Sequence, residues 1–136
     1  MDRAAALDFI GQNHRGVLAT TRADGTPQMS PVTAGIDDEG HVVISSRETA
    51  YKVRHLRALP YASYCGFVDG FFGEWVQVEG PVEVLELPDA MEPLVEYYRR
   101  IRGEHPDWQE YRAVMEQERR VLLRLTIERA GPTVSG

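Results

Sequence analysis

The stretch Trp75-Val76-Gln77-Val78-Glu79-Gly80-Pro81-Val82-Glu83-Val84 has the clearest alternation in the 136-residue chain. Its valines recur at every second position and are separated by polar residues, which is typical of a β-strand with one buried and one solvated face. Gly80 interrupts the valine series and predicts a bulge or a bend in a long strand. The fold therefore depends on which other strands can pair with this one.

Short strands separated by tight turns are expected on both sides of this stretch. Asp24-Gly25 is a hairpin signal, and the last strand alternates apolar residues with arginines. The other strands are expected at residues 16–21, 26–36, 41–45, 62–68 and 120–127, and helices at 2–13, 49–59 and, as a pair broken near Gly103, at 89–118. Asp2 and Asp107 are the expected N-caps.

Six strands joined by hairpin turns, with a few helices, favour a closed antiparallel sheet over a parallel one. We therefore predict a mainly β (α+β) fold, a six-stranded antiparallel barrel with flanking helices. The length fits a single domain at residues 1–130, followed by a loose tail at 131–136.

Composition excludes several functions. The single cysteine, Cys65, cannot form an internal disulfide or build a zinc site, and the four histidines have no metal-ligand spacing, so no metal is expected. A net charge of −6 argues against a nucleic-acid partner. With no secretory or membrane-spanning stretch, a soluble cytoplasmic protein is expected. The pattern singles out no catalytic residue, because no phosphate loop, dinucleotide fingerprint or nucleophile elbow is present.

The segment 45–57 concentrates positive charge, with four cations and one anion in an acidic chain. It runs from a strand into a helix, and a helix start offers free backbone N–H groups and a dipole that favours anions. Hydroxyl donors stand beside it at Ser45, Ser46 and Thr49. These features predict a binding site for a phosphate or carboxylate group.

Helical phasing separates the cations of this segment. At 100° per residue, Lys52 falls beside the apolar stripe that contains Leu56 and Leu59, whereas Arg54 lies on the opposite side. One interpretation is a lysine that extends along the apolar stripe with its amine in water. The neighbouring hydroxyls favour the other, in which Lys52 is an anion ligand with Arg47 and Arg54 nearby.

Two further stretches are candidate ligand contacts. In the expected strand 26–36, polar residues give way to apolar ones along one face at Pro31, and proline places that strand at an edge or a bend. Backbone groups there are free to contact a planar ligand, although an ordinary edge strand has the same pattern; the residues concerned are Gln28, Met29, Ser30, Pro31 and Val32. Trp75 shares the polar face of its strand with Gln77, which suits an interface, a stacking contact or simply an exposed aromatic. Arg99, Arg100 and Arg102 form either a solvated helix face or the wall of a groove.

Together these stretches resemble the flavin/deazaflavin oxidoreductase superfamily, also described as the pyridoxamine phosphate oxidase-like split β-barrel family. The likeness covers almost the whole chain. Its motifs are Gly16-Val17-Leu18-Ala19-Thr20 with Asp24-Gly25-Thr26-Pro27-Gln28, then Lys52-Val53-Arg54-His55-Leu56-Arg57 with Pro60, and Val78-Glu79-Gly80. Residues 103–108 and 119–123 are similar to the mycobacterial-type branch that binds coenzyme F420.

The resemblance implies a homodimer with two cofactor sites at the subunit interface. The cofactor's phosphate is expected at Lys52 and residues 45–49, its ring along residues 28–32, and Trp75 and Gln77 close to it. The sequence departs from the family at Ala50, where arginine is frequent, and at His55, where asparagine is common.

The function that the resemblance implies is hydride transfer between reduced F420 and a conjugated or quinone-like small organic substrate. Tyr51, His55 or solvent would supply a proton. The alternatives are an FMN-dependent oxidase or reductase of the same family, and a non-catalytic F420 carrier. Haem binding is a more distant option.

Overall fold

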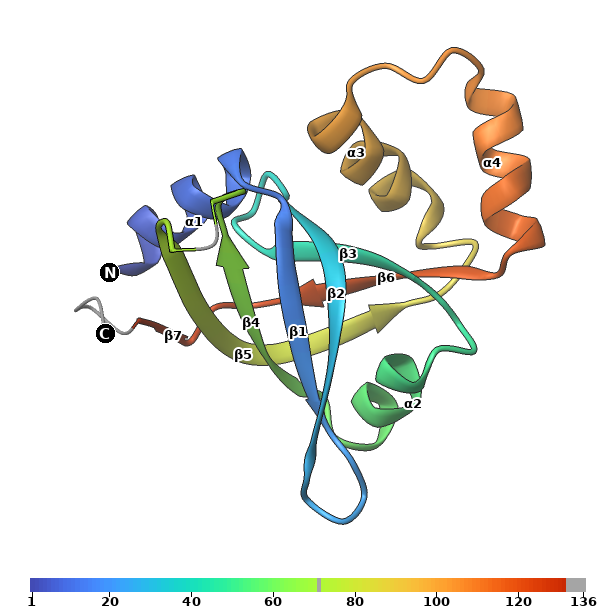
Figure 1. The fold of residues 1–136 in the computed structure, drawn as a ribbon. Helices are drawn as coiled ribbons and strands as arrows, with labels where there is room; N and C mark the ends of the chain where they lie inside the picture. Colours follow the sequence, from blue (N-terminus) through green and yellow to red (C-terminus); the bar gives the residue numbers. More distant parts are fainter. Residues whose placement is uncertain (71, 132–136) are drawn as a thin grey trace.

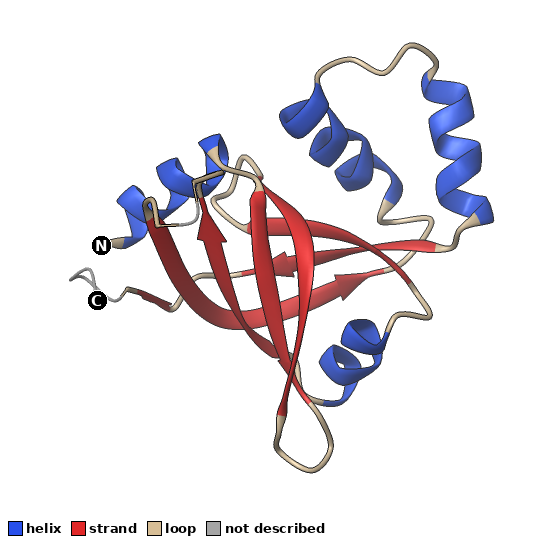
Figure 2. Ribbon diagram, viewed as in Figure 1, coloured by secondary structure: helices blue, strands red, loops and turns tan. Residues whose placement is uncertain are grey.

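The computed structural model describes residues 1–70 and 72–131 and is shown in Figures 1 and 2. Within these residues six antiparallel strands close into a barrel, and a two-residue strand, β7, pairs with β5. The strands are β1 (Arg15–Thr21), β2 (Pro27–Ile36), β3 (Val42–Arg47), β4 (Tyr61–Phe67), β5 (Trp75–Leu85), β6 (Arg120–Leu125) and β7 (Arg129–Ala130). The predicted fold is confirmed. Of the predicted tail, residues 132–136 lie outside the described residues.

The alternating strand β5 closes the barrel by changing partner along its length. Its residues 75–81 pair with β4 and its residues 82–85 pair with β6, and Figure 1 shows the strand curving between the two. The pairing continues without an extra residue at Gly80, so this glycine marks a bend and not a bulge. A Cβ atom at Gly80 would collide with the carbonyl oxygen of Thr126, so the close approach of two backbones requires glycine there.

Strand β2 also changes partner, and this leaves part of it with an open edge. Its residues 27–33 pair with β1, whereas only residues 34–36 pair with β3. In the described part of the chain, the other edge of residues 27–33 therefore has no strand beside it. The edge position predicted from Pro31 is confirmed.

Four described helices surround the barrel: α1 (Arg3–Gln12), α2 (Tyr51–Ala58), α3 (Met91–Arg102) and α4 (Trp108–Gln117). Both predicted N-caps are confirmed, since Asp2 Oδ1 accepts a hydrogen bond from Ala5 N–H at 2.8 Å and Asp107 Oδ1 accepts one from Glu110 N–H at 3.2 Å. Gly103, with φ of +80°, ends α3 as expected. None of these helices has both the length and the apolar character needed to cross a bilayer.

The barrel and the α3–α4 hairpin each have an apolar core. The inward faces of the strands form the core of the barrel around residues such as Leu18, Ile44 and Val78, and the buried faces of α1 and α2 pack against this core from outside. A second cluster, which includes Val43 and Leu122, joins the outer face of β3 and β6 to the two helices of the hairpin. Figure 1 shows the hairpin standing beside the barrel, so the second cluster fixes its position.

Two details of the predicted helix 49–59 were wrong. Helix α2 begins at Tyr51 and not at Thr49, and its N-cap, Ala50, makes no side-chain capping bond. Leu59 is 47% exposed because the chain has already left the helix there, in the extended conformation favoured before a proline.

Candidate functional site

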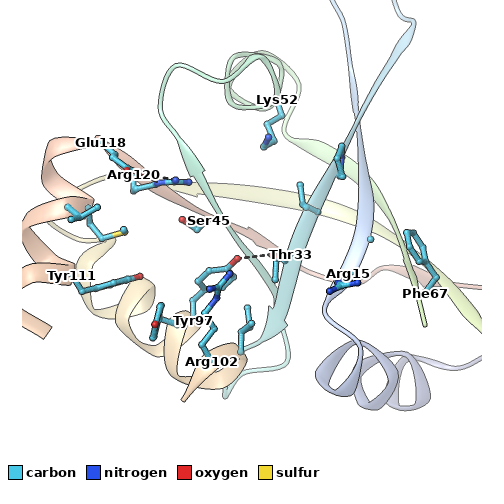
Figure 3. A pocket seen from close by; sticks show the side chains of 17 residues that line it. Arg15, Thr33, Ser45, Lys52, Phe67, Tyr97, Arg102, Tyr111, Glu118 and Arg120 are labelled. Carbon is cyan, nitrogen blue, oxygen red and sulfur yellow. Dashed lines mark hydrogen bonds and ion pairs between the residues drawn. The ribbon is translucent and has the colours of Figure 1, made fainter. Parts of the chain in front are cut away.

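A groove of about 840 Å³ runs between the barrel and the α3–α4 hairpin (Figure 3). Strands β1, β2 and β3 line one side, the hairpin lines the other, and α2 contributes Lys52. The lining residues are Arg15, Gly16, Pro31, Val32, Thr33, Ser45, Lys52, Phe67, Tyr97, Tyr98, Ile101, Arg102, Tyr111, Val114, Met115, Glu118 and Arg120. The groove passes the open edge of β2, where backbone groups are free of a neighbouring strand.

The groove is positively charged although the chain as a whole has a net charge of −6. Its described lining contains four cations, Arg15, Lys52, Arg102 and Arg120, and a single carboxylate, Glu118. Positive charge gathered in a recess attracts anions more strongly than the same charge spread over a surface. The groove is therefore suited to an anionic ligand.

Two of these cations face each other at one end of the groove. Figure 3 shows Lys52 extending from α2 and Arg120 extending from β6 into the same space, with Ser45 nearby. Burial, and then the positive charge of Arg120, lower the pKa of Lys52. In the described part of the chain Lys52 makes no hydrogen bond or ion pair. An anion placed between Lys52 and Arg120 would relieve their repulsion.

Strand alternation decides which serine reaches this end. Odd-numbered residues of β3 point outward, so Ser45 lines the groove. Ser46 points into the barrel, is 3% exposed, and donates its hydroxyl hydrogen bond to the carbonyl of Arg47 at 3.1 Å. The predicted pair of hydroxyl donors is thus divided between the two faces of one strand.

Tyr97 fixes α3 against the open part of β2. Its hydroxyl donates a hydrogen bond to the carbonyl of Thr33 at 2.8 Å, which is drawn in Figure 3. Burial raises the pKa of Tyr97, so its phenol stays protonated well above neutral pH. Deeper in the hairpin, Tyr111 donates to the carbonyl of Leu94 at 2.8 Å, and burial raises its pKa to about 12. Both tyrosines therefore serve as neutral hydrogen-bond donors that hold the wall of the groove.

The inner face of β2 forms a separate polar cluster beneath α2. His55 Nδ1 and Thr20 Oγ1 are 3.0 Å apart, and the Thr20 hydroxyl donates to Gln28 Oε1 at 3.5 Å. The hydroxyl oxygen of Ser30 is buried and has no hydrogen-bond partner in the described part of the chain. None of these side chains lines the groove.

Of the thirteen cofactor-binding residues predicted from sequence, four line the groove, namely Pro31, Val32, Ser45 and Lys52. Arg47 is next to it, with its Nε 3.7 Å from Glu118 Oε1. Arg54 points away and lies over the ring of Tyr51, 5.6 Å from its centroid. The other seven are on the inner face of the barrel (Gln28, Ser30, Ser46), on the surface (Met29, Thr49), or on the outer face of β5 (Trp75, Gln77).

Sequence reasoning missed most of the far wall. Of the three arginines in question on α3, Arg102 lines the groove, whereas Arg99 pairs with Glu96 and Glu104 and Arg100 pairs with Asp38. Arg120 was placed on the polar side of its strand but was not connected with Lys52. That connection depends on the pairing of β3 with β6, which juxtaposes residues distant in sequence.

The outer face of β2, β1, β4 and β5 has no helix over it in the described structure (Figure 1). Strand pairing places Pro31, Val17, Cys65 and Gln77 in one row across these four strands. Met29 is 65% exposed on this face, Phe67 38% and Trp75 37%. We call this surface the open sheet face. Exposed apolar side chains on a sheet face that no described helix covers are typical of an interface.

A sequence profile described as pyridoxamine 5'-phosphate oxidase matches residues 3–133. A conserved hypothetical protein from Mycobacterium tuberculosis has 24% identity and a TM-score of 0.77, over 100% of this chain and 93% of the other.

Two further solved structures carry functional names. An F420 reductase has 22% identity and a TM-score of 0.68, over 91% of this chain and 94% of the other. A heme binding protein from Mycobacterium smegmatis has 19% identity and a TM-score of 0.69, over 96% of this chain and 53% of the other. At these identities, the structural likenesses support the fold.

Proposed function

Because the chain belongs to the pyridoxamine 5'-phosphate oxidase family, we propose that it is an oxidoreductase that transfers a hydride between reduced F420 and a conjugated or quinone-like small organic substrate. Members of this family bind flavin-type cofactors. One observation carries the proposal, the cationic end at Lys52 and Arg120 beside the open edge of β2. The likeness to an F420 reductase favours the deazaflavin.

The donor set in the groove fits an anionic, planar cofactor. Lys52 and Arg120 would hold its phosphate with the hydroxyl of Ser45, and the backbone beside Pro31 and Val32 would lie along its ring. When bound, the cofactor supplies a hydride, and the protein binds, orients and shields the reactants. The groove is within the size range of about 300–1,000 Å³ of typical small-molecule sites.

The positions of Tyr51 and His55 argue against either side chain as the proton donor. Tyr51 is 66% exposed beneath Arg54, and His55 is hydrogen-bonded to Thr20. Neither side chain lines the groove. We therefore expect the proton to come from a hydroxyl that lines the groove or from solvent. Tyr97 keeps its proton at neutral pH, and its hydroxyl donates a hydrogen bond to the carbonyl of Thr33.

A second copy of the chain is the proposed occupant of the open sheet face. The family resemblance implies a homodimer, and this face presents apolar side chains next to the groove, since Phe67 lines the groove and pairs with Trp75. In a dimer through this face, Trp75 and Gln77 of one subunit would approach the cofactor of the other. Their predicted role therefore depends on the dimer.

An FMN-dependent oxidase or reductase is the second candidate, and the matched family profile favours it. The phosphate of FMN would use the same cationic end. A carrier that binds F420 without turnover would also use it. Chromophores distinguish these cases, because bound FMN is yellow as purified and haem gives a Soret band.

The test is a fluorescence titration of the purified protein with oxidised F420 and with FMN, followed by turnover assays with quinone-like acceptors. We expect F420 to bind and reduced F420 to be oxidised. Lys52→Gln should weaken binding about tenfold or more, as for loss of a charge-assisted hydrogen bond, whereas Arg57→Gln on the same helix should not. Tight FMN binding without F420 binding would overturn the F420 assignment, and F420 binding without turnover would indicate a carrier.

Matched substitutions also separate the sequence prediction from the groove geometry. Arg54 was predicted to bind the cofactor, but its guanidinium lies over Tyr51 and outside the groove. We therefore expect Arg54→Gln to behave like Arg57→Gln in the titration. A loss as large as that caused by Lys52→Gln would show that Arg54 reorients toward the ligand.

A further inference from the structure

Glu118 is the single carboxylate in the described lining of the basic groove. Its Oε1 atom accepts a hydrogen bond from Nε of Arg120 at 2.8 Å and forms an ion pair with Nη2 of the same guanidinium, also at 2.8 Å. Both side chains are largely shielded, with exposed fractions of 29% for Glu118 and 26% for Arg120. An ion pair shielded in this way is screened less by salt than one on the surface.

The backbone between these two residues is arranged to bring them together. Glu118 ends α4, Arg120 begins β6, and Arg119 between them has φ of +50°, a conformation that costs a non-glycine residue about 1 kcal/mol. Glu48 N–H donates to the carbonyl of Arg119 at 3.0 Å and so ties this turn to the loop that leads into Lys52. Strained backbone of this kind is concentrated at functional sites.

The pair leaves part of the guanidinium available. Glu118 engages Nε and Nη2, and Nη1 of Arg120 has no partner among the described residues. Figure 3 shows the guanidinium on the Lys52 side of the groove. Without the carboxylate, a long arginine side chain would lose this orientation to its own rotamer freedom, and the repulsion from Lys52 would favour other rotamers.

We propose that Glu118 is a positioning residue, which holds the Arg120 guanidinium toward Lys52 so that the two cations bind a phosphate group together. This inference rests on the proposed function for the identity of the phosphate-bearing ligand. The ligand class is a phosphate monoester or diester, because its oxygens can accept from both cations and from Ser45. Glu118 itself does not touch the ligand.

The opposite role is that of a competing anion. If Glu118 merely occupied the place of the ligand's negative charge, removing its charge would strengthen anion binding. The arrangement favours positioning, since the carboxylate contacts Arg120 through two nitrogens and makes no contact with Lys52. The two roles therefore predict opposite changes in anion affinity when the charge of Glu118 is removed.

The test measures the dissociation constants of F420, FMN and inorganic phosphate for the full chain and four variants: Glu118→Gln, Glu118→Ala, Arg120→Ala and the Glu118→Ala/Arg120→Ala double variant. We expect Glu118→Ala to weaken binding about tenfold, a typical effect of losing a charge-assisted hydrogen bond. Glu118→Gln, which keeps an acceptor oxygen, should restore most of this loss. In the Arg120→Ala background, Glu118→Ala should change affinity by less than about twofold.

Two readouts separate positioning from a general effect on the fold. The ¹⁵N resonance of Arg120 Nε should move in Glu118→Ala and largely return in Glu118→Gln, and thermal unfolding identifies a variant that does not fold. Tighter binding by both Glu118 variants would overturn the proposal in favour of a competing anion. An equal loss with and without Arg120 would overturn it in favour of a structural role.

The phosphate arm keeps this inference separate from the proposed function. If neither F420 nor FMN binds the unsubstituted protein, the proposed function fails, while the phosphate titration still tests Glu118. If phosphate also fails to bind at tens of millimolar, as judged by the Arg120 Nε resonance, the inference itself is wrong.

Discussion

Lys52 carries a charge that the free protein does not neutralise, and this gives it a distinct pH dependence. Burial and the neighbouring Arg120 lower its pKa from the ordinary 10.5. A bound anion favours the ammonium form of Lys52 and raises its pKa again. Binding therefore takes up a proton once the pH exceeds the pKa that Lys52 has without the anion. Affinity for an anion therefore falls with rising pH, starting below pH 10.5.

Lys52→Arg is the matched variant, because a guanidinium stays charged throughout this range. We expect its affinity for F420 or phosphate to stay nearly constant where that of the natural protein declines, as measured by titration at a series of pH values. The stability of the protein without an anion depends on pH in the opposite direction to its affinity for the anion. The unfolded chain holds the Lys52 proton more tightly, so the free energy of unfolding should rise with pH between the lowered pKa and 10.5. If the affinity of Lys52→Arg declines with pH in parallel with that of the natural protein, the pH dependence belongs to another group.

At the scale of single elements, β5 depends on Gly80. A side chain there would meet the carbonyl oxygen of Thr126, and backbone cannot move aside as a flexible side chain can. We expect Gly80→Ala to lower the free energy of unfolding by about 2–3 kcal/mol, a typical cost of overpacking, in urea denaturation. Gly70→Ala is the control, since a Cβ atom at Gly70 has no heavy atom within 4 Å. Equal effects of the two substitutions would show that β5 can shift at its bend.

The α3–α4 hairpin depends on an aromatic cluster of Tyr98, His105, Trp108 and Tyr111. Ring centroids in this cluster are 5.0–5.7 Å apart, and the Arg99 guanidinium lies 4.8 Å from the Trp108 ring centroid. Trp108→Ala removes both kinds of contact, each worth about 1 kcal/mol. We expect faster amide hydrogen exchange in α3 and α4, with the barrel strands still protected, and weaker cofactor binding.

Gln109→Ala is the control for the hairpin, because Gln109 is exposed on the same helical turn. It should leave exchange and binding close to those of the natural protein. If Trp108→Ala accelerates exchange throughout the barrel as well, the hairpin and the barrel unfold as one unit, and the two apolar clusters are not independent.

At the scale of the whole molecule, the open sheet face predicts self-association. Val17 lies near its centre, between Pro31 on β2 and Cys65 on β4. Burying an unpaired carboxylate in an interface is costly, so Val17→Asp should convert the expected dimer to a monomer in light scattering coupled to size exclusion. Leu59→Asp, on an exposed position of the α2 end, should leave the mass unchanged. A natural protein of monomeric mass would contradict the dimer.

Local pattern was enough to predict much of the fold. The alternation in β5, the caps at Asp2 and Asp107 and the break at Gly103 are each written in a few adjacent residues, and each is confirmed. The predicted end of α2 was wrong. Leu59 fits the helical period, but Pro60 ends the helix at Ala58, one residue before Leu59.

The candidate site was less accessible to sequence reasoning because distant segments build it. Lys52 could be predicted, since its helical phase and its neighbours are local. Arg120, Glu118 and Tyr97 could not, because their approach to Lys52 and Thr33 requires the β3–β6 pairing and the docking of α3. Ser45 and Ser46 were not separated for a similar reason: alternation shows that they point to opposite sides, and only the closed barrel shows which side is the groove.

The hairpin that forms the far wall of the groove lies between two strands that are already neighbours. Leu85 at the end of β5 pairs directly with Leu122 in β6, so the barrel closes at the foot of the hairpin whatever the intervening residues are. The segment between them behaves as an insertion in a β-turn. Its length and sequence can vary in evolution without disturbing the strands, provided that the residues of α3 and α4 next to the barrel still cover Val43 and Leu122. In such a lineage, one wall of the groove is replaced as a single segment while the strands of the barrel stay the same.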